Sequence, residues 1–242
     1  MKQPEETRKN QVQSDMTLWE HLDELRQRLV KAVIATLIGI VGGTLLTPRV
    51  LKLLVAPLGD MPLQTIRPTE APATFFKVAV VIGLVVAMPV IVYQFFQFLR
   101  PGLDPKERRY ILIGTPIASL SFAAGVVFAA TVLVPSAVPF LRGFLSEIVE
   151  HRYSIEYYLS FVSNVLLWTG LIFETPLVMF FLAQLGIATP EGFAGARRIV
   201  IAAAAVGAAV ITPTTDPVNM LLVMGPFLVL YELGILLARI AR

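Results

Sequence analysis

The sequence has 242 residues, of which 56% are hydrophobic and only 15% are charged. Soluble domains carry roughly 45–50% apolar and about 25% charged residues, so this composition indicates an integral membrane protein. The chain has no cysteine, which excludes disulfides, cysteine-ligated metals and thiol nucleophiles, and its two histidines are far apart. We therefore expect no metal or cofactor, and the net charge of +3 is too small to indicate nucleic-acid binding.

Six apolar segments are expected to cross the membrane, because a helix needs about 20 mostly apolar residues to span the bilayer core. They are residues 29–46, 75–99, 111–134, 158–185, 199–211 and 218–237. The fifth would rise only about 20 Å, so the bilayer beside it is expected to be thin. Residues 1–15 are polar and lack a signal-peptide core, which predicts a flexible tail before a single membrane domain, 16–242, that begins with an amphipathic helix.

The distribution of basic residues predicts the orientation. Most of the 20 Lys and Arg residues flank one set of segment ends, which the positive-inside rule assigns to the cytoplasm. Both termini then lie in the cytoplasm, as an even number of spans requires. The outward connections, 47–74 and 135–157, contain amphipathic pieces such as RVLKLLVAPL, which are expected to lie on the outer interface of the membrane.

The stretch EHLDELRQR directly before the first span is the first candidate site. Leucines recur there at helical spacing and form one apolar stripe, while the charged residues occupy other faces. Glu24 can pair with Arg28 one turn later. Taken alone, this pattern is typical of an ordinary juxtamembrane helix with a solvated charged face.

A second carboxylate, Glu107, stands among basic residues in the inward connection FLRPGLDPKERRYIL. It either pairs with Arg108 or Arg109 or is held for a visiting cation. Since both connections are expected on the cytoplasmic side, Glu24 and Glu107 together suit a ligand that bears two guanidinium groups, which carboxylates bind by charge-assisted, bidentate hydrogen bonds.

Glu174 lies deep in the fourth span, beside Pro176. An ionisable group at that depth is costly and is a functional candidate by default, although a protonated Glu bonded to a neighbouring helix is an equally good interpretation. Asp216 lies in the outward turn before Pro217, where it is a good helix N-cap. Prolines at 89, 116, 176 and 226 are expected to bend their helices.

Six short blocks together resemble the TatC family, the multispanning subunits of the twin-arginine protein translocase. They are HLDELRQRL, APL at 56–58, MPVIVYQFFQFLRPGL with KERR, FETP, ITPTTDP and YELGI, in this order over nearly the whole chain. The resemblance implies an all-α membrane protein with six spans, cytoplasmic termini and a concave, glove-like bundle that ends in two short spans.

The resemblance also implies a function. TatC is not an enzyme; it recognises Arg-Arg signal peptides of folded proteins, works with the single-span subunits TatA and TatB, and uses the proton-motive force. Self-association in the receptor complex and a location in the prokaryotic inner membrane are expected from it.

The family's functional positions are carried over by motif. Its signal-binding glutamates fall on Glu24 and Glu107. Nearby contributors fall on Arg26, Arg28, Leu29, Phe98 and Pro101. Its functional prolines fall on Pro57 and Pro89, its intramembrane acid on Glu174, and the acid of its outer turn on Asp216.

Three other functions compete with a receptor. An ion-coupled transporter or channel would explain Glu174 and the prolines, and it predicts solute flux. An intramembrane protease would need a Ser/His pair or two aspartates within the spans, and the sequence offers neither. A structural scaffold would differ from the receptor in lacking affinity for signal peptides.

Overall fold

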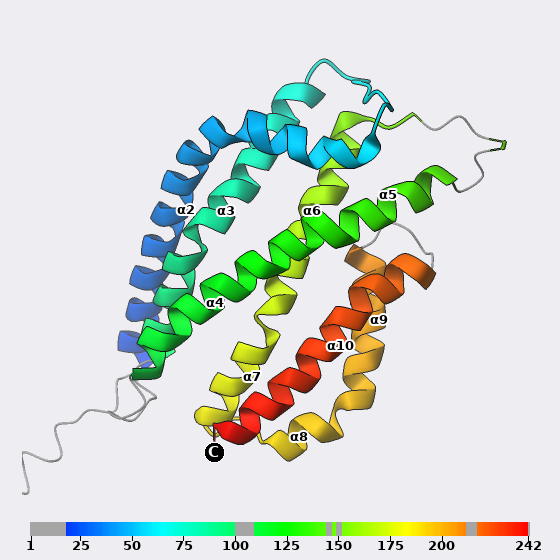
Figure 1. Ribbon diagram of the computed structural model, residues 1–242. Coiled ribbons are helices and arrows are strands. Elements are labelled where there is room, and N and C mark those ends of the chain that lie inside the picture. The colour runs from blue at the N-terminus through cyan, green and yellow to red at the C-terminus, as the bar shows by residue number, and fades with distance from the viewer. Residues whose placement is uncertain (1–17, 100–108, 144–146, 149–151, 212–216, 242) are drawn as a thin grey trace, which may run out of the picture.

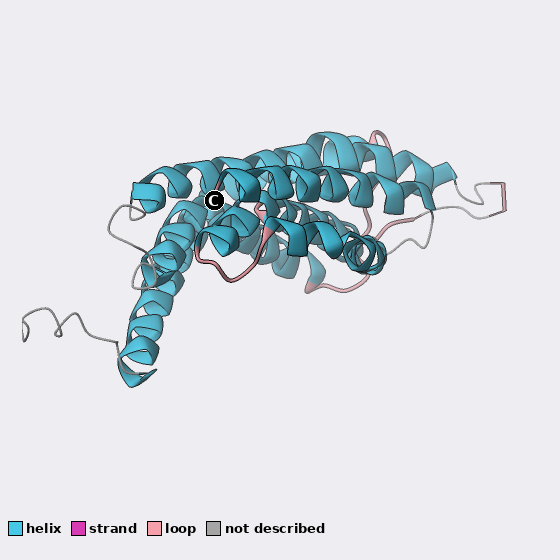
Figure 2. Cartoon of the chain, turned by 90° about the horizontal axis from the view of Figure 1, so that it is seen from below, coloured by secondary structure: helices cyan, strands magenta, loops and turns pink. Residues whose placement is uncertain are grey.

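The computed structural model describes residues 18–99, 109–143, 147–148, 152–211 and 217–241, and these are almost entirely helical (Figure 2). The elements are α2 (Leu18–Val55), η1 (Ala56–Leu58), α3 (Glu70–Leu99), α4 (Arg109–Phe128), the π-helical turn η3 (Ala129–Leu133), α5 (Val134–Gly143), α6 (Ile155–Phe173), α7 (Thr175–Gln184), α8 (Pro190–Gly195), α9 (Arg197–Ile211) and α10 (Pro217–Ile240). The expected all-α membrane architecture is therefore confirmed.

Five helical stretches in the described residues are long and apolar enough to cross a membrane. They are Trp19–Leu58, Glu70–Phe98, Leu112–Gly143, Ile155–Gln184 and Met220–Ile240. They correspond to five of the six expected segments; the first is extended at both ends, and each of the other four is extended at one end. The remaining segment is α9, whose 15 residues rise about 22 Å, short of the roughly 30 Å bilayer core. Figure 1 shows that α9 and α10 turn back well before they reach the level of the α5 and α6 tops.

The helix ends define two faces of the bundle. The start of α2, the end of α3 and the ends of α7 and α10 gather at the bottom of Figure 1, which we call the Glu24 end. The starts of α3 and α6 gather at the opposite Glu70 end. The chain does not leave helix at 47 as expected, because α2 continues through Pro48 to Val55. Its last turns bend across the Glu70 end, so the RVLKLLVAPL segment is continuous with the first span and lies across that end, while its position in the membrane stays a prediction (Figure 1).

Backbone contact between glycines joins α2 to α3. A Cβ atom added to Gly39 would lie 2.5 Å from the carbonyl oxygen of Gly83, and one added to Gly43 would lie 2.9 Å from that of Ala79. Close approach of small residues four apart is how helices pack in lipid, where burial of apolar surface gives no driving force. The opposite face of α2 is bare, with Leu45 81% exposed, as expected of a lipid-facing surface.

Three apolar clusters form the interior of the described residues, and two of them position the site. The larger one lies toward the Glu70 end and includes Leu58, Leu159 and Val162, each fully buried. The smaller one lies toward the Glu24 end, where the rings of Phe96 and Phe181 pack with centroids 4.3 Å apart. This cluster joins α3 to α4 and α7, and α3 in turn packs along α2, which positions the site described next.

Polar bonds close the Glu70 end. The buried carboxylate of Glu70 accepts hydrogen bonds from Ser154 Oγ at 2.9 Å and from the backbone N–H of Ile66 at 3.1 Å. Tyr158 donates to the carbonyl oxygen of Leu54 at 2.8 Å. These bonds attach the bent end of α2 and the following loop to α6, so this end is held by side chains as well as by packing.

Candidate functional site

The first turns of α2 present their polar side to the protein. His21, Glu24 and Arg28 recur at helical spacing and are half-buried, whereas the apolar stripe faces away. The exposed fractions of the stripe are 55% for Leu22, 42% for Leu25 and 61% for Leu29. The expected solvated charged face is therefore wrong for Glu24 and Arg28. The reason is tertiary: α3 supplies polar partners, and the leucines point away from the rest of the protein.

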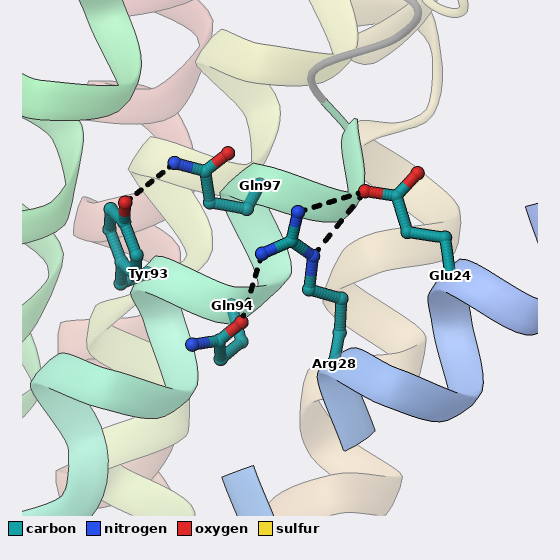
Figure 3. A network of polar contacts seen from close by, with 5 residues as sticks. All are labelled: Glu24, Arg28, Tyr93, Gln94 and Gln97. Atoms are coloured by element: carbon teal, nitrogen blue, oxygen red, sulfur yellow. Dashed lines mark hydrogen bonds and ion pairs between the residues drawn. The ribbon is translucent and has the colours of Figure 1, made fainter. Parts of the chain in front are cut away.

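Arg28 connects the two helices. Its Nη2 and Nε atoms donate to Glu24 Oε1 at 3.0 and 3.3 Å, which confirms the expected pair. Its Nη1 atom donates to Gln94 Oε1 on α3 at 3.4 Å. Figure 3 shows both bonds converging on one carboxylate oxygen, with the second oxygen of Glu24 directed away from Arg28. The carboxylate is thus half occupied by a guanidinium of the same chain.

The last turns of α3 contribute further polar and aromatic side chains to the site around Glu24. Gln97 donates to the hydroxyl of Tyr93 at 2.7 Å (Figure 3). The ring of Phe98 stacks on His21 with centroids 4.4 Å apart and an interplanar angle of 28°. The structure therefore brings the predicted residues Glu24, Arg28 and Phe98 together.

The sequence analysis did not identify four residues of this site: His21, Tyr93, Gln94 and Gln97. The signal was available in YQFFQF, because amides spaced three apart at the end of an otherwise apolar span mark one helix face that must find polar partners. His21 carried a weaker signal, since it shares a face with Glu24 and Arg28 at spacings of three and seven residues.

Other predicted residues lie elsewhere. Arg26 and Leu29 are exposed on α2 and do not face α3. Glu107 and Pro101 lie outside the described residues, in the connection between α3 and α4, and so does Asp216, between α9 and α10. The joint action of Glu24 and Glu107 therefore stays a prediction.

Glu174 lies at the junction of α6 and α7. Pro176 has no N–H to continue the α6 ladder, so α6 ends at Phe173 and α7 begins at Thr175. The Oε1 atom of the Glu174 carboxyl group is buried and has no hydrogen-bond partner among the described residues.

The carboxyl group of Glu174 borders an apolar groove of about 250 Å³ between α3 and α7. The lining residues include Met88, Phe95, Phe96, Leu177 and Phe181. The acid is thus placed in an apolar setting with hydrogen-bonding capacity unused, as expected for an intramembrane functional group.

The predicted prolines behave differently from one another. Pro57 lies in η1, where α2 ends. Pro89 lies inside α3, which stays continuous to Leu99, and its ring is exposed. Of the four prolines expected to bend spans, Pro176 marks a break between helices, and Pro89, Pro116 and Pro226 lie within continuous helices.

An exposed ion pair fixes the last two helices to each other at the Glu24 end. Arg197 at the start of α9 donates to both oxygens of Glu232 on α10, at 2.6 and 2.9 Å. Tyr231 donates to the carbonyl oxygen of Phe193 in α8 at 2.8 Å. Within the described residues no three His, Cys, Asp or Glu side chains gather closely enough to hold a metal ion.

The fold and the charged site around Glu24 define a multi-pass helical membrane protein whose polar site lies at an end of the bundle. A model of the family described as Sec-independent protein translocase protein (TatC) matches residues 20–226. The chain therefore belongs to the TatC family, whose members are subunits of a protein translocase and not enzymes.

Relatives and solved structures agree with this assignment. The chain is 36% identical over 229 residues to the TatC protein of Carboxydothermus hydrogenoformans, covering 94% of each chain. It is 34% identical to the chloroplastic TATC protein of Pisum sativum, covering 94% of this chain and 65% of that one. A crystal structure of the twin-arginine translocase receptor TatC superposes with a TM-score of 0.81 at 35% identity, covering 92% of this chain and 99% of that chain.

Proposed function

We propose that this chain is the signal-peptide receptor of a twin-arginine translocase and that it binds the Arg-Arg pair through Glu24 and Glu107. The observation that carries the proposal is the Glu24 carboxylate, which is half-buried and already accepts two hydrogen bonds from a guanidinium. A pocket that holds one guanidinium in this way has the chemistry to hold another.

Charge-assisted hydrogen bonds explain why the signal carries arginine. A guanidinium presents its donors as a planar fork that matches a carboxylate, whereas a lysine ammonium is a compact point charge. Glu24 offers its second oxygen on the side away from Arg28 (Figure 3). An Arg-to-Lys exchange in the signal keeps the charge but loses the fork, so it is expected to weaken binding.

The proposal includes a membrane topology. The Glu24 end faces the cytoplasm, both termini lie there, and α9 is the sixth, short span of a concave bundle in a locally thinned bilayer. Support comes from the basic residues that flank this end and from the early turn between α9 and α10 (Figure 1). The membrane is the inner membrane of a prokaryote.

The partners follow from the same proposal. They are TatA, TatB, further copies of this chain and the signal peptides of folded cargo, with export driven by the proton-motive force. Glu174 gives one of these contacts a chemical basis, since its unpaired Oε1 atom can accept a hydrogen bond from a partner helix in the membrane. Pro57, Pro89 and Asp216 act in shaping the loops and α3. Unchanged export and unchanged subunit crosslinking in Glu174→Ala would contradict the role of the acid.

Site-specific crosslinking in membranes tests the receptor function. A photoreactive signal peptide carrying Arg-Arg, or Lys-Lys in its place, is presented to the wild type and to Glu24→Gln and Glu107→Gln variants. Asp23→Asn is the matched control, because Asp23 is the neighbouring acid and is exposed on another side of α2. We expect crosslinking that requires Arg-Arg, falls by at least about tenfold in both glutamine variants, since a charged hydrogen bond contributes roughly 1.5–3 kcal/mol, and is retained in the control.

Crosslinking that ignores both the arginine pair and the two glutamates would reject the receptor. Glu24 would then be an ordinary juxtamembrane acid. Proteoliposome flux assays would follow in that case, because Glu174 beside an apolar groove is also compatible with an ion-coupled transporter.

A further inference from the structure

We propose that Arg28 is an internal competitor of the signal arginines: it occupies Glu24 in the empty receptor and must release Oε1 when a signal binds. The inference rests on the proposed function. It starts from the fact that the ligand chemistry expected of the signal, a guanidinium on Glu24, is already present within the chain.

The first step concerns the strength of the pair. Side-chain exposures of 25% for Arg28 and 18% for Glu24 show that both groups are only partly exposed to water. Exposed i, i+4 pairs contribute little because water screens them, whereas partly buried pairs keep more of their attraction. A signal arginine that approaches Glu24 therefore meets an acceptor that is not free.

The second step concerns where Arg28 goes. Its Nη1 atom already reaches Gln94 Oε1 at 3.4 Å, at the long limit of a hydrogen bond. A small rotation away from Glu24 would tighten that bond, since the amide stands on α3 on the other side of the guanidinium (Figure 3). Gln94 thus offers a second hydrogen-bond acceptor, so the released guanidinium of Arg28 is not left unpaired in a half-buried position.

The consequence is that Arg28 lowers the affinity for every cationic ligand and does not change the selectivity between them. If only a fraction of receptors have Glu24 unoccupied, the apparent dissociation constant of every ligand rises by the inverse of that fraction. Arg-Arg and Lys-Lys signals are then weakened by the same factor. The discrimination between them remains with the geometry of Glu24, while Arg28 keeps weak cationic peptides below the concentration at which they bind.

Removing Arg28 tests this directly. The full-length protein in lipid nanodiscs is titrated with a fluorescent synthetic signal peptide carrying Arg-Arg, and with its Lys-Lys counterpart. For Arg28→Gln we expect both affinities to rise by about 3- to 10-fold, with their ratio unchanged. Lys31→Gln is the matched control: it removes a positive charge three residues further along α2, at an exposed position outside the proposed site, and should change affinity by less than about 2-fold.

Gln94 gives an independent test through a double-mutant cycle. Gln94→Leu alone should lower affinity by about 2- to 4-fold, because the displaced Arg28 loses its acceptor. The same change in the Arg28→Gln background should have no effect. A Gln94 effect that persists without Arg28 would mean that Gln94 contacts the peptide itself, which contradicts the proposal.

The outcomes separate the inference from the function on which it rests. An Arg28→Gln variant that binds no better than Lys31→Gln, while Glu24→Gln still loses binding, would overturn the competitor and leave the receptor intact. Wild-type-like binding by Glu24→Gln would overturn the receptor itself. Arg28→Lys guards against a folding defect: it keeps the charge but loses the fork, and we expect about a 2-fold gain in affinity, while a loss would show that Arg28 positions Glu24 instead.

Discussion

Replacing Gly39 by alanine tests whether α2 and α3 are held together by direct backbone contact. The added Cβ atom would lie 2.5 Å from the carbonyl oxygen of Gly83 and 3.2 Å from its carbonyl carbon and Cα atom. Ordinary contacts begin near 3.4 Å, so the helices must separate by about 1 Å. A gap of that size forfeits a quarter to a half of the dispersion energy of the atoms that line it.

The cost can be set against a control in the same helix. Gly42 has nothing within 4 Å of an added Cβ, so Gly42→Ala changes helix propensity without changing the interface. Overpacking costs about 1–3 kcal/mol, and each kcal/mol moves Tm by roughly 2–4 °C in a chain of this length. We therefore expect the Tm of Gly39→Ala to lie about 2–12 °C below that of Gly42→Ala.

Thermal unfolding of both variants in the same detergent, followed by size-exclusion chromatography, measures this difference. Equal Tm values would refute the reasoning, because they would mean that α2 is not pressed against Gly83. A decrease in both variants would point to the helix itself and not to the interface between α2 and α3.

Two further substitutions probe single interactions elsewhere. Tyr158→Phe removes the hydrogen bond to the Leu54 carbonyl at the Glu70 end and should cost about 1 kcal/mol, or about 2–4 °C in Tm. Tyr157→Phe is the control and should have no effect, because Tyr157 is 73% exposed. Equal Tm values for the two variants would count against a structural role of the bond. Gly186 follows α7 with φ of +68°, and a Cβ atom added to it would have nothing within 4 Å. Gly186→Ala should therefore cost about 1 kcal/mol through backbone strain alone, and Gly186→Asn should cost less, since Asn tolerates this conformation. The reverse order of their Tm values would contradict this explanation.

Much of the fold could be read from the order of residues. Runs of apolar residues longer than a bilayer core predicted the long spans, because in lipid a backbone can satisfy its polar groups only within a helix. Their ends were less predictable. The first span was expected to end at residue 46, yet α2 continues through Pro48 to Val55, and the Tyr158 hydrogen bond to the Leu54 carbonyl attaches its bent end to α6.

The sequence predicted some of the residues that form the site, but not which residues of other helices contact them. The spacing of Glu24 and Arg28 predicted their pair, since two positions one turn apart must be neighbours on a helix. Which face of that helix would be covered was beyond the sequence. The sequence indicated a solvated charged face, and the structure exposes the leucine stripe and covers the polar side instead, because Gln94 and Phe98 pack there from 66 or more residues further along the chain.

The sequence by itself determined what this protein is made of: helices long enough to span a membrane, an acid before the first of them, and an acid beside a proline in another. These follow from local rules of length, polarity and spacing. Only the tertiary structure decided that Arg28 stands between Glu24 and Gln94, and that glycines bring α2 and α3 into backbone contact. Such contacts join residues far apart in the chain, so they depend on how whole helices pack, which no local pattern records.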